Sequence, residues 1–580
     1  MAKQPVDQNP LLDAAGNWQY PEFAEEHGTE KVVAFGDHSH RCPIYVCKVP
    51  PCTAGCPAGN DIRAWLTIVQ QTELKNRSLA ESYELAWHEA SKTTPFPAAC
   101  GRVCPNPCEG KCNRSQKNEG PVNIAAFERG LGDYGIRHGL EHKKLTASRM
   151  DHTVAVIGAG PAGLSCAFQL ARRGYPVTVF EALAKPGGML RYGIPAFRLP
   201  RPVLDAEIAA ISRMGVEIVC NTVIGREKGL AELQAGFDAI FVGIGAQTGV
   251  ELEGEEIEAP NVLSGVTFLN QVNAGKGVAV GDKVVVVGGG NTAITAARVA
   301  RRLGAQVTIL YRRTRAEMPT LDREIDDALS EDIDIQYLVA PLGIRTENGQ
   351  AVSVTCQKME LGEPDDSGRR RAIPIAQSHY ELPCTTLISA ISQRPDWGGL
   401  RLNTTPQGWL RPDENWAVGT GIYAGGDVIS LALVTTAIGH GRKAAERIEA
   451  QLKGERYRSP AARKIATPED MRLEYYPELK RNQQAWVPVA ERCTMGLDLE
   501  ADLGLSEAQI RAESMRCMSC GLCFECRQCL IFCPQTAIQA FPHNPTGEVM
   551  YTSYSKCVGC HICSLACPCG YIEMGMGGEL

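Results

Sequence analysis

The sequence lacks an excess of positive charge, a long apolar run and a recognisable targeting segment. Its formal net charge is −7, which gives no support for nucleic-acid binding, because such proteins normally carry a basic patch. No stretch of about 18 uninterrupted apolar residues occurs, so we expect no membrane span. The N-terminus shows no basic segment followed by an apolar run, so we expect no secretory signal either.

Cysteine is scarce in the middle of the chain. Of 24 cysteines among 580 residues, eight lie in residues 42–112, eleven in 517–569 and only five between them. Clusters with repeated spacings of two and three residues favour metal binding by thiols that stay reduced in a cytoplasm. The five isolated thiols form no Cys-x2-Cys or Cys-x4-Cys pair, which argues against disulfide exchange. We interpret these five as structural: Cys166, Cys220, Cys356, Cys384 and Cys493.

The length indicates several domains. Residues 1–150 mix Cys-Pro loops with short helical patterns, one of them Asp61–Thr72, where Asp61 can cap the helix. Its apolar face is predicted to contain Ile62, Trp65, Leu66 and Val69. Strand–glycine–helix units follow from Thr153 to Gly454, then a segment rich in proline and charge, 455–512, which we expect to be a linker over the surface. The last unit, 513–580, contains two cysteine runs that repeat after 34 residues, from Cys523 to Cys557.

The first glycine-rich turn follows an apolar strand, Val154–Ile157, and opens a helix. Its pattern is typical of a dinucleotide site, in which glycines allow a tight turn, close approach of a pyrophosphate and close helix packing. An acid at the end of the next strand can accept hydrogen bonds from a ribose diol. The candidate residues are Gly158, Gly160, Pro161, Ala162, Gly163 and Glu181.

A second turn repeats this design with Gly288, Gly290, Asn291, Thr292 and Ala293. Its second strand, Val307–Leu310, ends without the acid, and Arg312 and Arg313 follow instead. Guanidinium groups can pair with a 2′-phosphate, which favours NADPH over NADH. A solvated basic corner is the alternative for both arginines. Two dinucleotide folds in one chain suggest hydride exchange between a nicotinamide and a flavin.

With two further motifs, the central region resembles the small subunit of bacterial glutamate synthase and the flavoproteins built on it. Pro186–Pro200 matches that family's Gly-Gly-x-Leu-x-Tyr-Gly-Ile-Pro stretch, and Gly425–Asp427 matches its Gly-Gly-Asp. The resemblance covers roughly residues 40–454. It implies FAD in a discontinuous domain, 151–248 and 411–454, with an NAD(P) domain, 249–410, inserted into it. It implies further cofactor-binding residues at Gly188, Leu190, Gly193, Ile194, Arg198, Gly245, Gly426 and Asp427. Asp427 precedes a predicted helix, Val434–Leu452, so helix capping is the alternative for this acid.

The N-terminal cysteines favour iron–sulfur clusters over zinc. Eight thiols with prolines between them suit such clusters, and the paired Cys-x2-Cys knuckles of zinc ribbons are absent from this region. The candidates are Cys42, Cys47, Cys52, Cys56, Cys100, Cys104, Cys108 and Cys112. The resemblance implies two 4Fe–4S clusters, one held by Cys47, Cys52, Cys112 and Cys42, the other by Cys56, Cys104, Cys108 and Glu128. The first spacing departs from the family pattern and Cys100 is additional. The membership of Cys42, Cys100 and Glu128 therefore stays open, with a surface helix glutamate as the alternative for Glu128.

The C-terminal cysteines follow the bacterial ferredoxin pattern, in which the fourth Cys of each run binds the other cluster. This predicts one cluster on Cys523, Cys526, Cys529 and Cys567, and another on Cys533, Cys557, Cys560 and Cys563. Cys517, Cys520 and Cys569 are left over, as buried thiols or as a shifted register of the first run.

Together these features predict a multidomain α/β enzyme: a helical iron–sulfur domain, two Rossmann-like domains and an α+β ferredoxin-like domain. We expect it to pass electrons between NAD(P)H, FAD and four 4Fe–4S clusters, to or from a protein partner, and it can run in either direction. The partner is a ferredoxin or a redox enzyme; the opening Cys42–Arg63 is similar to the iron–sulfur flavoprotein associated with dissimilatory sulfite reductase. A non-catalytic relay or scaffold subunit is the alternative, and a homo-oligomer stays open.

Overall fold

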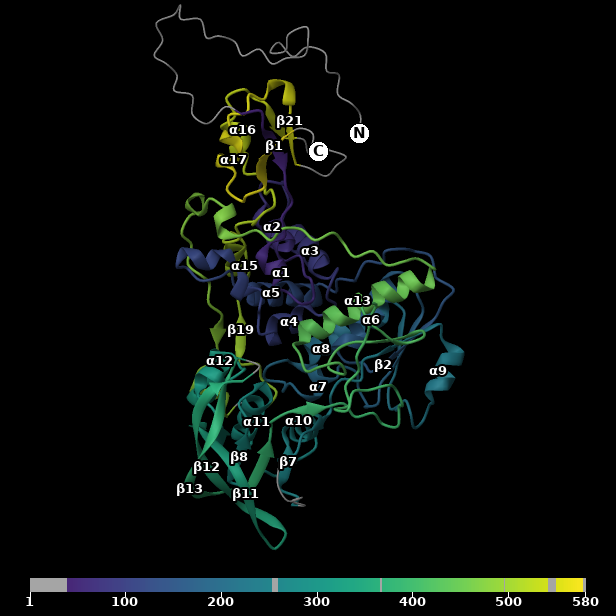
Figure 1. Ribbon diagram of the computed structural model, residues 1–580, viewed down its shortest axis with the longest axis vertical. Coiled ribbons are helices and arrows are strands. Elements are labelled where there is room, and N and C mark those ends of the chain that lie inside the picture. The colour runs from purple at the N-terminus through teal and green to yellow at the C-terminus, as the bar shows by residue number, and fades with distance from the viewer. Residues whose placement is uncertain (1–38, 253–258, 366–367, 495, 541–548, 577–580) are drawn as a thin grey trace, which may run out of the picture.

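The computed structural model describes residues 39–252, 259–365, 368–494, 496–540 and 549–576. Figure 1 shows an elongated arrangement, in which the C-terminal module lies at one end beyond the N-terminal helices, one α/β unit lies beside these helices and the other α/β unit lies at the opposite end. The predicted multidomain α/β class is confirmed. None of the helices within these ranges is both long and apolar enough to cross a membrane.

The first α/β unit contains a six-stranded sheet assembled from two separate parts of the sequence. All its pairings are parallel except that of the edge strand β16. The central strands are buried apolar runs, as expected for a parallel sheet covered on both faces. Strand order is β16 (Ala417–Gly419), β17 (Ile422–Ala424), β5 (Ala239–Val242), β2 (Val154–Ile157), β3 (Val177–Phe180) and β4 (Val216–Val219).

Two helices of this unit pack backbone to backbone. In α13 (Val434–Leu452), a Cβ on Gly441 would lie 2.1 Å from the carbonyl oxygen of Ala162 in α6 (Pro161–Arg172). This contact joins the two separate parts of the sequence, and the predicted strand 154–157 and helix 434–452 are confirmed. The remaining helices of the unit are α7 (Met189–Tyr192), α8 (Arg201–Arg213) and α9 (Leu230–Gly236).

The second α/β unit is inserted between β5 and β16. Its parallel sheet has the order β10 (Asp334–Tyr337), β9 (Gln306–Tyr311), β8 (Lys283–Val287), β14 (Thr386–Ser389) and β7 (Val262–Ser264). Its helices are α10 (Gly265–Asn273), α11 (Asn291–Arg302) and α12 (Asp322–Ser330). An antiparallel sheet extends from it, with β11 (Val339–Glu347), β12 (Gln350–Pro364) and β13 (Arg370–Pro383), and β6 (Thr248–Gly249) pairs with β15 (Gln393–Arg394) where the chain enters and leaves.

The N-terminal unit is helical. In α2 (Ile62–Gln70), Asp61 accepts a hydrogen bond from the Ala64 amide, which confirms the predicted cap. The predicted apolar face is confirmed as well, since all four of its side chains are buried, and Trp65 stacks on Phe127 at 5.3 Å. The other helices are α1 (Pro51–Ala54), α3 (Leu79–Ala90), α4 (Pro97–Val103) and α5 (Ile124–Arg137), with 3-10 turns at Glu109–Lys111 and Asn113–Lys117.

The C-terminal module contains a strand from the other end of the sequence. β1 (Cys42–Tyr45) pairs antiparallel with β22 (Ile572–Gly575), and the Val46 amide donates to the carbonyl of Tyr571. Residues 42–45 therefore lie with the ferredoxin-like module and not with the N-terminal helices (Figure 1). The module's other elements are α16 (Gln528–Ile531), α17 (Ile562–Ala566), β20 (Ile538–Ala540) and β21 (Met550–Thr552).

Residues 455–512 do more than cover the surface. Glu500 accepts from Arg102 of α4 at 2.7 Å, and Asp327 of α12 accepts from Arg492 at 2.9 Å. The segment therefore ties the N-terminal helices to the second α/β unit, a role that its proline- and charge-rich composition did not predict. Its elements are α14 (Val489–Arg492), α15 (Glu507–Ser514), β18 (Ala485–Trp486) and β19 (Asp502–Gly504).

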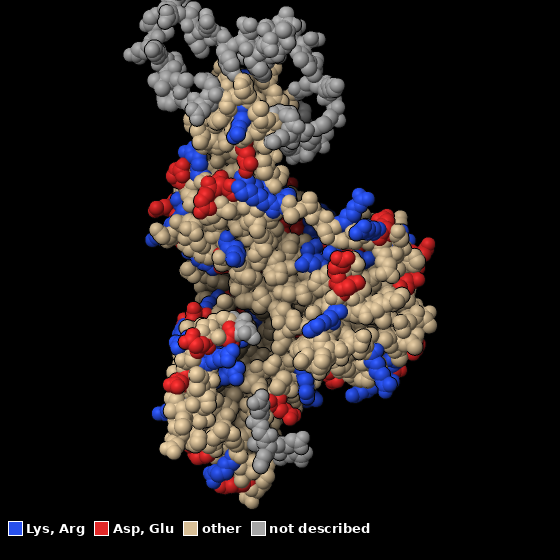
Figure 2. Space-filling view, in the orientation of Figure 1, with Lys and Arg blue, Asp and Glu red and all other residues tan. Residues whose placement is uncertain are grey.

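Charged side chains of both signs are interspersed over the face shown in Figure 2. No large single-sign field is visible on this face, in keeping with the net charge of −7.

Candidate functional site

One cavity of about 860 Å³ is lined by both glycine-rich turns. This volume suits a large ligand, since ligand pockets usually measure about 300–1,000 Å³. The N-terminal helices supply part of the wall through Val103 and Cys104. Most of the predicted cofactor residues line this cavity: Gly158, Gly160, Pro161, Ala162, Glu181, Gly188, Leu190, Gly193, Ile194, Arg198, Gly245, Gly290, Asn291, Thr292, Gly426 and Asp427.

The first turn accepts only glycine at two of its three positions. Gly158 has φ of +100°, and a Cβ there would lie 2.5 Å from the carbonyl oxygen of Gly243. A Cβ on Gly163 would lie 1.9 Å from the carbonyl oxygen of Gly158. For a Cβ built on Gly160, the nearest atom is the Cα of Gly188, at 3.9 Å. Two residues without side chains, Gly160 and Gly188, thus face each other at the N-terminus of α6. Backbone amides without side chains at a helix N-terminus fit the pyrophosphate of FAD.

Glu181 lies at the carboxyl end of β3, as the sequence predicts. Its carboxylate accepts hydrogen bonds from the amides of Ala159 at 2.7 Å and Leu183 at 2.9 Å. Burial raises its pKa, and these amide donors oppose that effect. Both carboxylate oxygens keep further acceptor capacity at the cavity wall, which suits a ribose diol.

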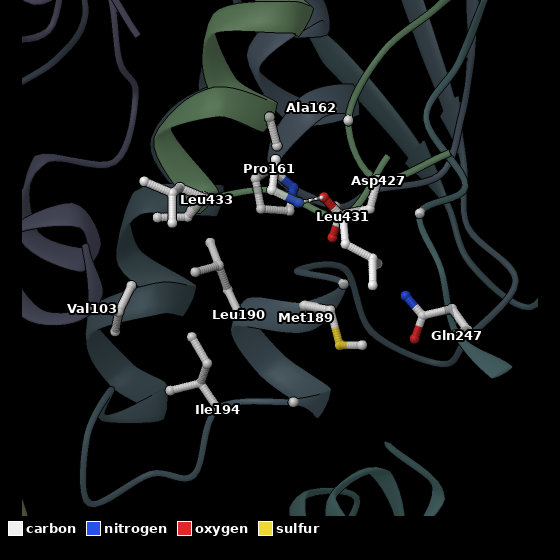
Figure 3. A pocket seen from close by; sticks show the side chains of 18 of the residues that line it. Val103, Pro161, Ala162, Met189, Leu190, Ile194, Gln247, Asp427, Leu431 and Leu433 are labelled. Carbon is white, nitrogen blue, oxygen red and sulfur yellow. Dashed lines mark hydrogen bonds between the residues drawn. The ribbon is translucent and has the colours of Figure 1, made fainter. Parts of the chain in front are cut away.

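Asp427 lies across the first turn from α7. Figure 3 shows Asp427 beside Pro161 and Ala162, with Met189 and Leu190 opposite. Its carboxylate accepts from the Ala432 amide at 3.2 Å, and burial raises its pKa to about 6.

The capping alternative for this acid does not hold. Leu433 occupies the N-cap of α13 and no side chain caps that end. The neighbouring Gly426 amide donates to His440 Nδ1 at 3.2 Å, and burial lowers the pKa of His440 to about 4, so the imidazole is neutral at pH 7. The acid of the Gly-Gly-Asp motif is thus available to sugar hydroxyls.

The second turn is built like the first. Gly288 has φ of +138°, and a Cβ there would lie 2.4 Å from the carbonyl oxygen of Ala390. Ala293 is fully buried against the sheet. A Cβ on Gly289 would meet the ring of Tyr311 at 2.4 Å, so the carboxyl end of β9 lies directly over this turn.

Arg198 joins the two α/β units at the cavity. It donates to Thr295 Oγ1 at 3.3 Å and to Glu324 at 2.7 Å, both on helices of the second unit. Gln393, which the sequence reasoning missed, donates to Thr292 Oγ1 at 3.1 Å and also lines the cavity. The sequence feature that could have identified Gln393 is its position, as a polar residue shortly after the last buried strand of the inserted unit.

The two arginines after β9 differ sharply. Arg313 is buried and donates to Asp365 at 2.8 Å and to the carbonyl of Arg370 at 2.6 Å. Arg312 is exposed at the end of the strand that covers the second turn. Arg312 therefore suits a 2′-phosphate, whereas Arg313 supports the β12–β13 sheet.

One group of N-terminal cysteines lies with Glu128 near the cavity. Burial, together with the nearby Cys56, Glu109, Glu128 and Cys104, raises the pKa of the Cys108 thiol. Cys104 contacts Thr435 Oγ1 at 3.7 Å, at the start of α13.

Glu128 is buried and is not a surface helix residue. Its carboxylate accepts from Asn60 at 3.1 Å, and burial raises its pKa to about 8. Cys100, also buried, lies beside Glu128 and Cys104. The structure thus brings together the set implied by the resemblance, with Cys100 as a fifth member.

Cys42 and Cys47 are not grouped as the sequence analysis expected. Cys42 lies on β1, and its thiol lies beside that of Cys557 in the C-terminal module. Cys47 is exposed, whereas Cys52 and Cys112 line a separate small cavity. Because β1 pairs with a strand from the far end of the sequence, the expected grouping of Cys42 with Cys52 and Cys112 is corrected, whereas the membership of Cys47 stays a prediction.

The C-terminal runs cross over as the ferredoxin pattern predicts. Burial, reinforced by the neighbouring Cys526 and Cys567, raises the pKa of Cys523 to about 11, and burial with Cys523 and Cys567 raises that of Cys529 to about 12. The other four thiols line one small cavity: Cys533, Cys557, Cys560 and Cys563.

The donor chemistry fits iron–sulfur clusters. None of the 24 cysteines, all of which lie in the described ranges, forms a disulfide. No three His, Cys, Asp or Glu side chains in the described parts of the chain are arranged to hold a single metal ion. Four thiols spread around a small cavity instead suit a cluster with several metal atoms.

These two features, a cavity between two dinucleotide folds and clustered thiols, define an NAD(P)H-dependent iron–sulfur flavoprotein oxidoreductase. The chain belongs to the pyridine nucleotide-disulphide oxidoreductase family, whose model matches residues 152–441. A second model, described as dihydropyrimidine dehydrogenase domain II, 4Fe-4S cluster, matches residues 20–140.

Named relatives agree with this class. The chain is 36% identical to the NADPH-Fe(3+) oxidoreductase subunit beta of Geobacter sulfurreducens, over 88% of this chain and 80% of the relative. It is 35% identical to the NADP(+)-dependent formate dehydrogenase subunit beta of Moorella thermoacetica, over 81% and 70%. It is 34% identical to the glutamate synthase [NADPH] small chain of Escherichia coli, over 69% and 88%. The resemblance to the glutamate synthase small subunit is therefore confirmed.

Proposed function

We propose that this chain oxidises NADPH and delivers the electrons one at a time to a protein partner through four iron–sulfur clusters. When bound, FAD supplies the exchange between a two-electron hydride and single electrons, and iron–sulfur clusters supply one-electron transfer. The observation that carries the proposal is the single cavity lined by both glycine-rich turns, with Cys104 in its wall. Nicotinamide, flavin and the nearest thiols would thus share one enclosed space.

The chain's residues divide the binding between two units. Gly160, Gly188, Glu181 and Asp427 would hold FAD in the unit formed by 151–248 and 411–454. The second turn, with Arg312, would hold NADPH in the inserted unit, 249–410. Arg198 fixes the two units against each other through its bonds to Thr295 and Glu324, which orients the two cofactors for hydride transfer.

The partner would receive electrons at the far end of the molecule. The C-terminal module lies at one end and the inserted unit at the other (Figure 1). The relatives from Geobacter and Moorella are named as beta subunits and that from Escherichia coli as a small chain. By analogy we propose that this chain works within a larger redox complex, with a ferredoxin or a redox enzyme such as a dissimilatory sulfite reductase as its partner.

Anaerobic titration of the purified, flavin-loaded chain with NADPH tests this function. We expect bleaching of the flavin absorbance, followed by the electron paramagnetic resonance signals of reduced clusters. A flavin that neither NADPH nor NADH reduces would contradict the proposal and leave a non-catalytic relay subunit. A chain that reduces its flavin and none of its clusters would contradict the electron path alone.

A further inference from the structure

Four cysteines from the two ends of the sequence line one small cavity. Two come from the N-terminal unit, Cys52 in α1 and Cys112 after the 3-10 turn Glu109–Lys111. The other two, Cys517 and Cys520, follow α15 and precede the first ferredoxin run. More than 400 residues of sequence separate the two pairs.

The loop that carries Cys517 and Cys520 is fixed to the N-terminal part of the chain by hydrogen bonds. Gln70 of α2 donates to the carbonyl oxygen of Cys517 at 3.0 Å. Arg63 of the same helix donates to Ser519 Oγ at 2.7 Å. The Lys48 amide donates to the Gly521 carbonyl at 3.0 Å.

Two further details hold this loop in place. Tyr476 donates to the Met518 carbonyl at 2.7 Å. Gly521 has φ of +73°, and a Cβ there would lie 2.5 Å from the Cβ of Lys48. Four of the five positions from 517 to 521, all except Cys520, are therefore specified by a packing contact or hydrogen bond, as a ligand loop must be.

The surroundings of the four thiols suit a thiolate-bound cluster. The cavity wall is otherwise formed mainly by apolar residues, such as Leu66, Val122 and Ile124, and its other polar members are Arg63, Asn113 and Arg114. Apolar walls exclude water, and the positive charge of Arg63 offsets part of the negative charge that four thiolates bring. Arg114 is paired with Glu119.

The four thiols also influence one another. Cys112, Cys520 and Cys517 all act electrostatically on the Cys52 thiol, so the four side chains lie close together.

We propose that Cys52, Cys112, Cys517 and Cys520 ligate one 4Fe–4S cluster shared by the N-terminal unit and the segment that leads into the ferredoxin-like module. This inference rests on the proposed function for the presence of clusters, and it assigns ligands to the two cysteines that the ferredoxin pattern left over. It also replaces Cys42 and Cys47 in the set that the resemblance implied.

The position of this cluster sets the order of electron transfer. Cys52 precedes Cys56 by one turn of chain, and Cys56 belongs to the group beside the flavin cavity. Cys520 likewise precedes Cys523, the first ligand of the ferredoxin run. The shared cluster thus lies between the flavin-side cluster and the ferredoxin clusters, and it passes one electron at a time with no bond made or broken.

Iron and acid-labile sulfide measured per chain test the proposal, on protein reconstituted anaerobically with FAD retained. Replacing Cys517 and Cys520 with serine should remove about four Fe and four sulfide of about sixteen each. The double variant of Cys384 and Cys493, two thiols outside all the groups, is the matched control and should keep full iron. Unchanged iron in C517S/C520S would overturn the proposal.

The combined variant makes the test sharper. C52S/C112S should remove the same four Fe, and the quadruple variant should still lose about four, because all four residues serve one cluster. A loss of about eight would show two separate clusters and overturn the sharing. Loss of one zinc ion per chain, with iron unchanged, would show a zinc site and overturn the assignment of an iron–sulfur cluster.

Folding and function are read separately in the same samples. Flavin content and circular dichroism should match the control, and NADPH should still bleach the flavin in every variant. Should C517S/C520S not fold, the single variants C52S and C517S are compared by iron content in its place, with the same expected loss of about four. Failure of NADPH to bleach the wild-type flavin would contradict the proposed function and not the ligand assignment.

Discussion

Replacing Arg312 with alanine should weaken NADPH and leave NADH almost unaffected. Arg312 is exposed at the end of β9, and the neighbouring Tyr311 ring lies over Gly289 of the second turn. A charge-assisted hydrogen bond to a phosphate contributes about 1.5–3 kcal/mol, and solvent screening at an exposed position reduces it. We therefore expect a loss of about 1–2 kcal/mol, or about 5- to 30-fold in kcat/KM for NADPH.

Arg313→Ala provides the contrasting variant. Arg313 is buried and donates to Asp365 and to the carbonyl of Arg370, so its removal takes away two hydrogen bonds at the turn between β12 and β13. The expected cost is about 1–3 kcal/mol of stability, seen as a lower Tm, with NADPH and NADH affected alike.

Stopped-flow flavin reduction over a range of NADPH and NADH concentrations separates the two cases. Equal loss for both nucleotides in R312A would refute the assignment of this residue to a 2′-phosphate. A selective loss of NADPH in R313A would show that the buried ion pair opens on binding, contrary to the structure.

Three further outcomes follow from particular contacts. Glu331 is fully buried; burial would raise its pKa, but hydrogen bonds from Arg302 and Arg298 lower it to about 2. These ion pairs should therefore contribute about 3 kcal/mol to the free energy of unfolding above pH 4.5, and the contribution should be lost as the pH falls toward 2. E331Q should lower Tm at pH 7 and make stability less dependent on acid pH. An unchanged dependence of stability on acid pH would contradict this. Gly160→Val would fill the space facing Gly188, so the chain should purify largely without FAD but with normal circular dichroism, and full flavin content would refute the cradle. Cys42→Ser should keep about sixteen Fe per chain, whereas loss of about four would restore Cys42 to the N-terminal cluster.

Local patterns were enough to predict much of the central region. A run of apolar residues followed by spaced glycines has few physical solutions, because only glycine tolerates the positive φ and close contacts at positions such as Gly158 and Gly288. The strand at Val154–Ile157, the cap at Asp61 and the helix at Val434–Leu452 follow from similarly local rules. The class of protein follows as well, since two such turns and clustered cysteines indicate the chemistry.

The sequence alone also determined, through spacing, which thiols could serve as ligands. It also identified an acid that could bind a ribose. Only the tertiary structure decided how the thiols are grouped and which arginine faces solvent. Cys517 and Cys520 lie beside Cys52 and Cys112 because α2 holds their loop by hydrogen bonds, and Cys42 lies beside Cys557 because β1 pairs with β22. Spacing constrains ligands within one loop, whereas contacts between distant segments depend on packing, which leaves no periodic signal in the sequence.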